Sequence, residues 1–183
     1  MLEDSGATKG LLAIHVRRGD FEEHCRTLAL WSADWHAWNS FTEFIDQFEK
    51  IRGMSQNETI NIYHDHCYPS IQQIVDKVNR VRQESHPTYN LTYLYIMTNG
   101  PTTWVEELKT ALAEGAAWES IKSSRDLDLT WEEKFVAHAV DMFVAQKAEV
   151  IIGNGVSSLH VSRPNVLSTI GRISLQLLKG MSY

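Results

Sequence analysis

A cluster of basic side chains follows a short apolar run near the N-terminus, in the segment HVRRGDF at positions 15–21. The run at 11–16 is typical of a buried strand, and open α/β sheets bind ligands beyond the carboxyl ends of their strands. Because neighbouring residues of a strand face opposite sides, we expect Arg17 and Arg18 to point in different directions. One guanidinium can donate two hydrogen bonds to a phosphate while the other pairs with Asp20. A surface turn with solvated charges is the alternative explanation.

A glycine- and serine-containing segment, IIGNGVSSL at 151–159, follows a predicted strand and precedes a predicted helix. Gly153 and Gly155 allow the backbone to turn sharply and to approach a ligand closely. Ser157 and Ser158 add hydroxyl donors at a helix start, where free backbone N–H groups attract phosphate. The segment has neither the GxGxxG spacing nor a Walker lysine, so it is not a dinucleotide fingerprint or a P-loop. An ordinary strand-turn-helix connection with a serine N-cap is the alternative.

One acidic residue, Asp141, lies in the middle of the helix that is predicted before this segment, between Val140 and Met142. A carboxylate is a fitting acceptor for the N1–H and the N2 amino group of guanine, which are adjacent donors. A solvated position on the helix is the alternative explanation of this aspartate.

Two other groups of polar residues bear on metal and nucleophilic chemistry. The segment at 64–67, His-Asp-His-Cys, has metal-ligating residue types, but no second cluster completes a tetrahedral site, so we predict no metal. His24 and Cys25 are adjacent, and side-by-side residues rarely reach each other as base and nucleophile. Cys25 and Cys67 either form one disulfide or remain two thiols, and the sequence leaves both possibilities open.

The composition is that of one globular domain. The chain has 183 residues, 43% of them apolar and 22% charged, which allows a packed core within a single domain. The formal net charge of -6 and the lack of a Lys/Arg-rich run argue against a nucleic-acid partner. No apolar stretch of about 20 residues occurs, so we expect no segment that spans a membrane. The polar residues 1–10 do not resemble a signal peptide.

Short apolar runs alternate with longer amphipathic ones, which indicates βαβ units and a parallel sheet. We expect strands at about 11–16, 60–63, 91–97, 118–121 and 150–152. We expect helices at about 69–78, 102–114 and 130–144, and a last one from about 157 or 164 to 178; the third begins with a capping box of Thr130 and Glu133. The core-facing stripe of this third helix is predicted to contain Phe135, Val136, Ala139, Val140, Phe143 and Val144. The aromatic-rich segment at 21–52 is interpreted as a helical insertion, and 1–10 as a polar tail.

Together, these residues resemble the GDP-fucose-dependent fucosyltransferases, in particular the protein O-fucosyltransferase family and its fungal relatives. HVRRGDF is similar to the family's first donor motif, in which a histidine is followed two residues later by an essential arginine. Arg17 matches that arginine, so the resemblance implies that Arg17 is the catalytic residue. It also implies that His15 and Arg18 belong to the substrate-binding site.

The later motif of the family consists of a helical aspartate, then a strand, then a Gly-x-x-x-Ser-Ser/Thr loop. In this sequence Asp141 precedes Ser157 by 16 residues, which is a similar spacing. The resemblance implies that Asp141 contacts guanine and that Ser157 and Ser158 contact the diphosphate. The other implied donor-binding residues are Gly153, Asn154 and Leu159, the last in a position where many relatives carry an aromatic residue.

The family's fold implies a Rossmann-like parallel sheet flanked by helices over 11–183, similar to the C-terminal half of a GT-B glycosyltransferase. The implied reaction transfers fucose from GDP-fucose to a hydroxyl of a protein or glycan acceptor, without a metal or a further cofactor. A missing N-terminal half or a second copy of the chain is the implied partner, and the ER or Golgi lumen is the implied compartment. A non-catalytic GDP-sugar-binding module, or a structural α/β domain that lacks acceptor chemistry, is the alternative.

Overall fold

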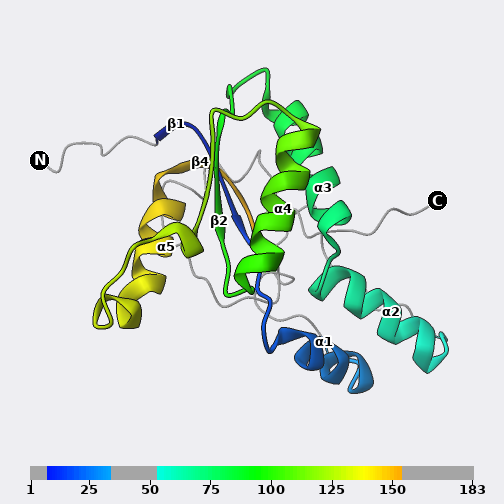
Figure 1. Ribbon diagram of the computed structural model, residues 1–183. Coiled ribbons are helices and arrows are strands. Elements are labelled where there is room, and N and C mark those ends of the chain that lie inside the picture. The colour runs from blue at the N-terminus through cyan, green and yellow to red at the C-terminus, as the bar shows by residue number, and fades with distance from the viewer. Residues whose placement is uncertain (1–7, 34–52, 154–183) are drawn as a thin grey trace, which may run out of the picture.

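A parallel sheet of four strands, in the spatial order β3-β2-β1-β4, forms the centre of the computed structural model (Figure 1). The structure describes residues 8–33 and 53–153. The strands are β1 (Thr8–His15), β2 (Tyr93–Met97), β3 (Ser120–Ser123) and β4 (Ala148–Ile152). Helices cover both faces of the sheet, so the predicted α/β class with a flanked parallel sheet is confirmed.

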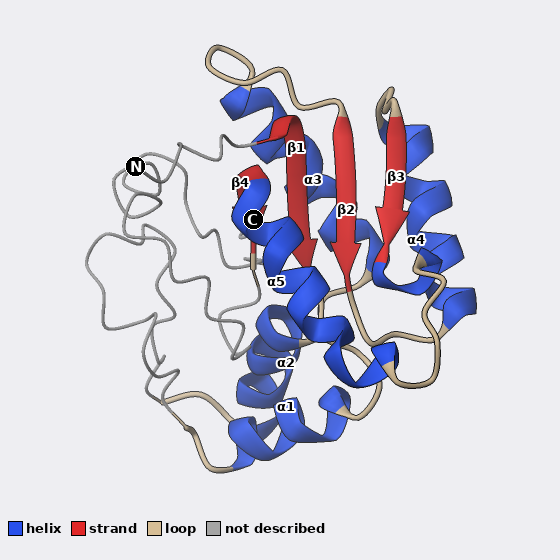
Figure 2. Ribbon diagram, turned by 90° about the vertical axis from the view of Figure 1, so that its left-hand side faces the viewer, coloured by secondary structure: helices blue, strands red, loops and turns tan. Residues whose placement is uncertain are grey.

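The helices form three groups around this sheet. They are α1 (Phe21–Leu30), α2 (Gln56–Cys67), α3 (Ile71–Ser85), α4 (Thr102–Gly115) and α5 (Ala137–Lys147), with the 3-10 helices η2 (Ser124–Asp126) and η3 (Glu133–Val136). α3 and α4 lie against one face of the sheet and α5 against the other (Figure 1). Figure 2 shows α1 and α2 beyond the carboxyl ends of the strands. None of the helices described in 8–33 and 53–153 is long and apolar enough to cross a membrane.

The direction in which strands are added reverses at β1. From β1 the chain adds β2 and then β3 on one side, and after α5 it returns to place β4 on the other side. The register pairs Leu12 with Leu94 of β2 and with Val150 of β4, and it pairs Ile14 with Ile152. In open α/β sheets, the crevice at such a reversal, outside the carboxyl ends of the strands, is where ligands bind.

The two faces of the sheet bury different side chains. Leu12 and Ile14 of β1 are at most 1% exposed and pack in the main core with apolar residues of α3 and α4. Ala13, between them, faces the opposite side, where it packs in a smaller cluster with Tyr95 and with Ala145 of α5. This alternation determines which way the residues after β1 are directed.

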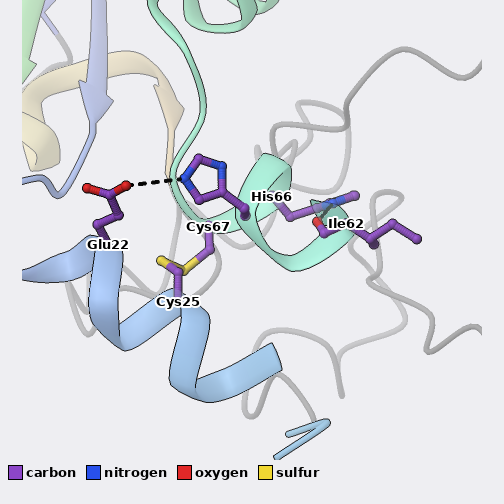
Figure 3. Close-up of a disulfide and its surroundings, with 6 residues drawn as sticks. Glu22, Cys25, Ile62, His66 and Cys67 are labelled. Carbon is purple, nitrogen blue, oxygen red and sulfur yellow. Dashed lines mark hydrogen bonds and ion pairs between the residues drawn. A yellow bond between two sulfur atoms is a disulfide. The ribbon is translucent and has the colours of Figure 1, made fainter. Parts of the chain in front are cut away.

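The segment 60–63 lies inside α2, so the prediction of a strand there is wrong. Ser55 and Glu58 form a capping box at the start of this helix, in which the Ser55 N–H donates to Glu58 Oε2 at 2.8 Å. α2 packs against α1, and a disulfide joins Cys25 of α1 to Cys67 of α2 (Figure 3). The cap and this packing select a helix, although the alternation of apolar and polar residues at 60–63 also suits a strand.

The apolar stripe predicted for the helix at 130–144 is only partly buried: Val144 packs against the sheet, but residues of η3 and one residue of α5 do not. Phe135, Val136 and Phe143 of the predicted stripe are 64%, 54% and 59% exposed, so the prediction is wrong for these residues. The predicted reciprocal hydrogen bonds between Thr130 and Glu133 are present, but the helix that begins at Glu133 is the 3-10 helix η3. The three residues per turn of this 3-10 helix shift the phase of the helix that follows. The small residue Ala145 is buried against the sheet instead.

Candidate functional site

The carboxyl ends of β1 and β4 lie side by side and bring two of the predicted site segments together. Because Ile14 pairs with Ile152, His15 and Gly153 are the next residues along the two strands and leave the paired region next to each other. HVRRGDF and the beginning of the glycine-containing loop therefore meet at one edge of the sheet. The predicted donor-binding residues Asn154, Ser157, Ser158 and Leu159 lie outside the described residues.

His15 lies on the α5 side of the sheet, like its paired neighbour Met97, and the alternation of the backbone predicts the same side for Arg17. Val16, between them, is 2% exposed, packs in the core with residues of α3 and α4, and donates its N–H to Met97 O at 3.0 Å. Backbone alternation then directs His15 and Arg17 to the opposite face. α5 runs back from the carboxyl edge of the sheet to the start of β4, so its first turns lie toward the same edge (Figure 2).

Arg17 is held loosely at this edge. Its side chain is 40% exposed and lies 3.6 Å from the carboxylate of Asp20, which is 74% exposed. The guanidinium also lies 5.1 Å from the centre of the Phe21 ring, and its Nε is buried without a hydrogen-bond partner among the described residues. Ion pairs between exposed groups contribute only about 0–1 kcal/mol. Arg17 therefore has a weak partner at the surface and a buried donor without a partner among the described residues.

Arg18 points the other way, into the interior, and is only 3% exposed. Its guanidinium carbon lies 4.0 Å from the centre of the Tyr68 ring and 4.4 Å from that of Trp104, and Nη2 donates to the carbonyl of Pro69. Burial lowers the pKa of the Arg18 guanidinium from its ordinary value, and Tyr68 acts in the opposite direction. The contact of Arg18 with substrate stays a prediction, whereas its aromatic partners are a feature that the sequence did not reveal.

Asp141 lies on α5 above the same face of the sheet, and both of its oxygens accept hydrogen bonds. Tyr95 of β2 donates its hydroxyl hydrogen to Oδ1 at 2.9 Å, and Ser124 Oγ lies 2.9 Å from each carboxylate oxygen. Burial raises the pKa of the Asp141 carboxyl from its ordinary value, while the hydrogen bonds from Ser124 and Tyr95 lower it. The aspartate is therefore held in a fixed orientation and is not a freely solvated helix residue.

Sequence reasoning missed Tyr95 and Ser124 as partners of Asp141. They lie 46 and 17 residues away from it along the chain, so no local pattern links the three. The alternation of β2 is a partial signal, because the register places Tyr95 opposite Ala13 and hence on the face that α5 covers.

His15, the last residue of β1, is partly buried at the carboxyl edge of the sheet. Burial, with the charge of Arg17 as the second cause, lowers the pKa of the His15 imidazole to about 4. The ring is therefore neutral at pH 7, where one nitrogen donates and the other accepts a hydrogen bond. A neutral ring can contact a polar ligand group without adding repulsion to Arg17.

The metal-ligating residue types at 64–67 lie at the end of α2. Cys67 is engaged in the disulfide, and His64 Nε2 lies 3.9 Å from Glu22 Oε1. Throughout the part of the chain that the structure describes, no three His, Cys, Asp or Glu side chains are grouped to hold a metal ion. The candidate residues that the structure describes are thus the guanidinium of Arg17, the imidazole of His15 and the carboxylate of Asp141.

No protein-family model and no curated protein sequence matches this chain. Among solved structures, the chain is similar to POFUT1 in complex with GDP-fucose, with 16% sequence identity and a TM-score of 0.47. It is also similar to the apo form of POFUT1, with 14% identity and a TM-score of 0.48, and to a second crystal form of the GDP-fucose complex, with 17% and 0.43. Each similarity covers 91% of this chain and 38% of the POFUT1 chain. The chain thus spans well under half the length of those structures.

Proposed function

We propose that this chain binds GDP-fucose between the ends of β1 and β4 and supplies the donor-binding half of a fucosyltransferase-like glycosyltransferase. The observation that carries the proposal is the reversal of strand order at β1, because it brings the segment that follows His15 and the loop that begins at Gly153 to one edge of the sheet, with α5 over one face. The resemblance of the segments 15–21 and 141–158 to donor motifs of fucosyltransferases supports the choice of GDP-fucose.

Arg17 is proposed to bind the β-phosphate and to act in the chemical step. When the bond between fucose and GDP breaks, positive charge builds on the sugar and negative charge gathers on the departing β-phosphate. A guanidinium that donates two hydrogen bonds stabilises this developing charge, and one preorganised donor contributes about 3–4 kcal/mol to lowering the barrier. The weak ion pair with Asp20 supports this role, since it leaves Arg17 free to turn to a ligand.

Asp141 is proposed to bind the guanine base. A carboxylate has about four acceptor positions, and Tyr95 and Ser124 can each donate only one hydroxyl proton. Their hydrogen bonds therefore leave two positions for the N1–H and the amino group of guanine. Because the same two residues fix the orientation of the carboxylate, little conformational entropy is lost when the base binds.

The ER or Golgi lumen is the proposed compartment. Disulfides persist in oxidising compartments and are rare in the cytosol, and Cys25 and Cys67 are joined by one. Both cysteines are fully buried, so the bond belongs to the folded core of the α1–α2 pair.

Calorimetric titration with GDP tests the proposal on the wild type and on Arg17→Ala and Asp141→Ala. We expect each substitution to weaken GDP binding at least about tenfold, since each removes a charged hydrogen-bonding partner. Arg80→Ala and Asp128→Ala, which remove exposed charges from α3 and from the loop before η3, are the matched controls and should bind like the wild type. If both site variants also bind like the wild type, the site is assigned wrongly.

Two further measurements separate the proposed enzyme from its alternatives. Turnover of GDP-fucose with protein and glycan acceptors supports a transferase, whereas GDP binding without turnover assigns a non-catalytic binding module. A ligand at 100 times its dissociation constant adds about 2.7 kcal/mol to the free energy of unfolding. If GDP leaves the melting temperature unchanged at millimolar concentration, the chain is a structural α/β domain.

A further inference from the structure

The backbone that carries Arg17 is held by groups that lie outside the proposed donor site. The N–H of the next residue, Arg18, donates to Asn99 Oδ1 at 2.7 Å. Asn99 lies in the loop after β2, and Arg125 of η2 fixes this loop by donating from Nη2 to Asn99 O at 2.7 Å and from Nε to Gly100 O at 2.9 Å. The loop after β1 is thus hydrogen-bonded to the loop after β2, which in turn is hydrogen-bonded to η2.

The side chain of Arg18 secures the same backbone from the opposite side of the sheet. Its guanidinium lies between the rings of Tyr68 and Trp104 and donates to the carbonyl of Pro69, which precedes α3. Arg18 is 3% exposed, so its guanidinium would lose the two rings and the Pro69 carbonyl if it turned outward to a ligand. Tyr68 directly follows Cys67, so the disulfide between Cys67 and Cys25 of α1 also limits how far Tyr68 can move.

The close fit of Gly19 against Asn99 completes this arrangement. Gly19 has a φ of +58°, and a Cβ built on it lies 3.1 Å from Asn99 Nδ2. The side-chain amide of Asn99 therefore accepts from the N–H of Arg18 and also lies close to the next residue, Gly19. Of the two arginines, Arg17 is the one whose side chain is left at the surface, where it pairs weakly with Asp20.

We propose that Arg18 and Asn99 are positioning residues that hold the backbone of Arg17, so that Arg17 alone of the two arginines reaches the donor diphosphate. The inference rests on the proposed function for the identity of the ligand. It assigns Arg18 a role through packing: its planar group fills the space between two rings, which a lysine of equal charge does not do. It assigns Asn99 a role through one hydrogen bond to the Arg18 amide.

A double-mutant cycle on GDP affinity tests whether Asn99 acts through Arg17. We expect Asn99→Ala to weaken binding about fivefold to tenfold, and the double variant with Arg17→Ala to bind no more weakly than Arg17→Ala alone. Asn61→Ala, on the exposed side of α2, is the control and should not change the affinity. Losses that add up in the double variant would overturn the proposal, because they would show that Asn99 acts independently of Arg17.

Two substitutions of Arg18 separate positioning from direct contact with phosphate. Arg18→Lys keeps the charge and Arg18→Met keeps only the apolar stem, so a positioning role predicts that both lose affinity to a similar extent. A direct phosphate contact predicts that Arg18→Lys keeps most of the wild-type affinity, and this result would refute the role given to Arg18.

Amide hydrogen exchange in the protein without ligand keeps the inference testable apart from the proposed function. Asn99 is exposed, so Asn99→Ala is compatible with folding. We expect this variant to exchange the Arg18 amide at least about tenfold faster, since the amide loses its acceptor. An unchanged exchange rate would overturn the positioning role even if the protein binds GDP, and faster exchange would support it even if GDP does not bind.

Discussion

Tyr95 donates its hydroxyl hydrogen to Asp141 Oδ1 across 2.9 Å, and this bond joins the middle of β2 to α5. Tyr95 is 7% exposed, so the bond is made in a place where water competes little. Ser124 adds a second donor from η2. Residues of β2 and η2 therefore both donate to the Asp141 carboxylate of α5. The packing of α5 is thus coupled to the orientation of the group that we propose to bind guanine.

Tyr95→Phe is expected to lower the free energy of unfolding by about 1–3 kcal/mol, because it removes a hydrogen bond to a charged, partly buried acceptor. Chemical denaturation measures this difference. Tyr93→Phe is the matched control, since this tyrosine lies on the same strand and its hydroxyl bonds the carboxylate of Glu119 at a site that is 39% exposed, so its effect should stay within about 0.5 kcal/mol. Equal effects of the two substitutions would contradict a special role for the bond to Asp141.

Asp141→Asn is expected to reduce the preference for guanine. The side-chain amide places an N–H group where the carboxylate offers an acceptor, so GDP binding should weaken about tenfold to a hundredfold. Binding of UDP, whose base lacks the paired donors of guanine, should change little. Titrations with both nucleotides measure the ratio of affinities, and a ratio equal to that of the wild type would exclude Asp141 from the base site.

His15 is expected to make the stability depend on pH between about 4 and 6.5. The pKa of His15 falls to about 4 in the fold from 6.5 in the unfolded chain, so only the unfolded chain takes up the proton in this window. The free energy of unfolding therefore contains a contribution that is fully present above pH 6.5 and is lost as the pH falls toward 4, by about 3 kcal/mol at most.

Chemical denaturation of His15→Gln between pH 4 and 7.5 measures this contribution. The difference in stability between the wild type and the variant should shrink or change sign as the pH falls through the window. His86→Gln removes an exposed imidazole at the end of α3 and serves as the control. A constant difference between the wild type and His15→Gln over the whole range would show that His15 does not have the lowered pKa.

Loss of the disulfide is expected to destabilise the protein substantially. Cys25 and Cys67 are separated by 42 residues, and closing a loop of this length contributes about 4 kcal/mol in the chain-entropy description. Unfolding of the wild type with and without a reductant, compared with the Cys25→Ser/Cys67→Ser variant, measures the effect. The reductant should leave the double variant unchanged, and a wild type that is equally stable after reduction would contradict the expectation.

Gly19→Ala is expected to cost more stability than Gly53→Ala, although both glycines have a positive φ. A side chain in this region of backbone conformation costs about 1–2 kcal/mol at either site. At Gly19 the added Cβ also lies 3.1 Å from Asn99 Nδ2, whereas at Gly53 no atom lies within 4 Å. Equal changes in the free energy of unfolding would show that the close approach of Asn99 to Gly19 adds nothing to the cost of the substitution.

Much of the fold could be predicted from consecutive residues. The apolar runs at 11–16 and 150–152 overlap with β1 and β4, because a strand buried in a parallel sheet has apolar residues at successive positions. The segment at 91–97, which alternates and is rich in residues that favour strands, overlaps with β2. The parallel arrangement followed from the helices between the strands, and it places HVRRGDF and Gly153 at strand ends. These features depend on residues that are neighbours in the chain, so the sequence alone was sufficient.

Local patterns failed where two structures compete for the same residues. The segment 60–63 alternates like a strand, yet the cap at Ser55 and the packing of α2 against α1 make it helical. The apolar residues Phe135 and Phe143 suggest a buried stripe, yet Phe135 lies in the 3-10 helix η3 and Phe143 on α5, and both are exposed. In both cases the outcome depends on contacts with other elements, which periodicity within one segment does not contain.

The sequence by itself determined which residue types stand at the carboxyl ends of the strands, and it marked Arg17, Arg18 and Asp141 as candidates. Only the tertiary structure decided that Arg18 is enclosed while Arg17 stays at the surface, and that Cys25 is joined to Cys67. The reason is physical: a guanidinium can be buried only where rings and a carbonyl from distant segments surround it. The groups that enclose Arg18 come from positions about 50 and more residues away, at Tyr68, Pro69 and Trp104.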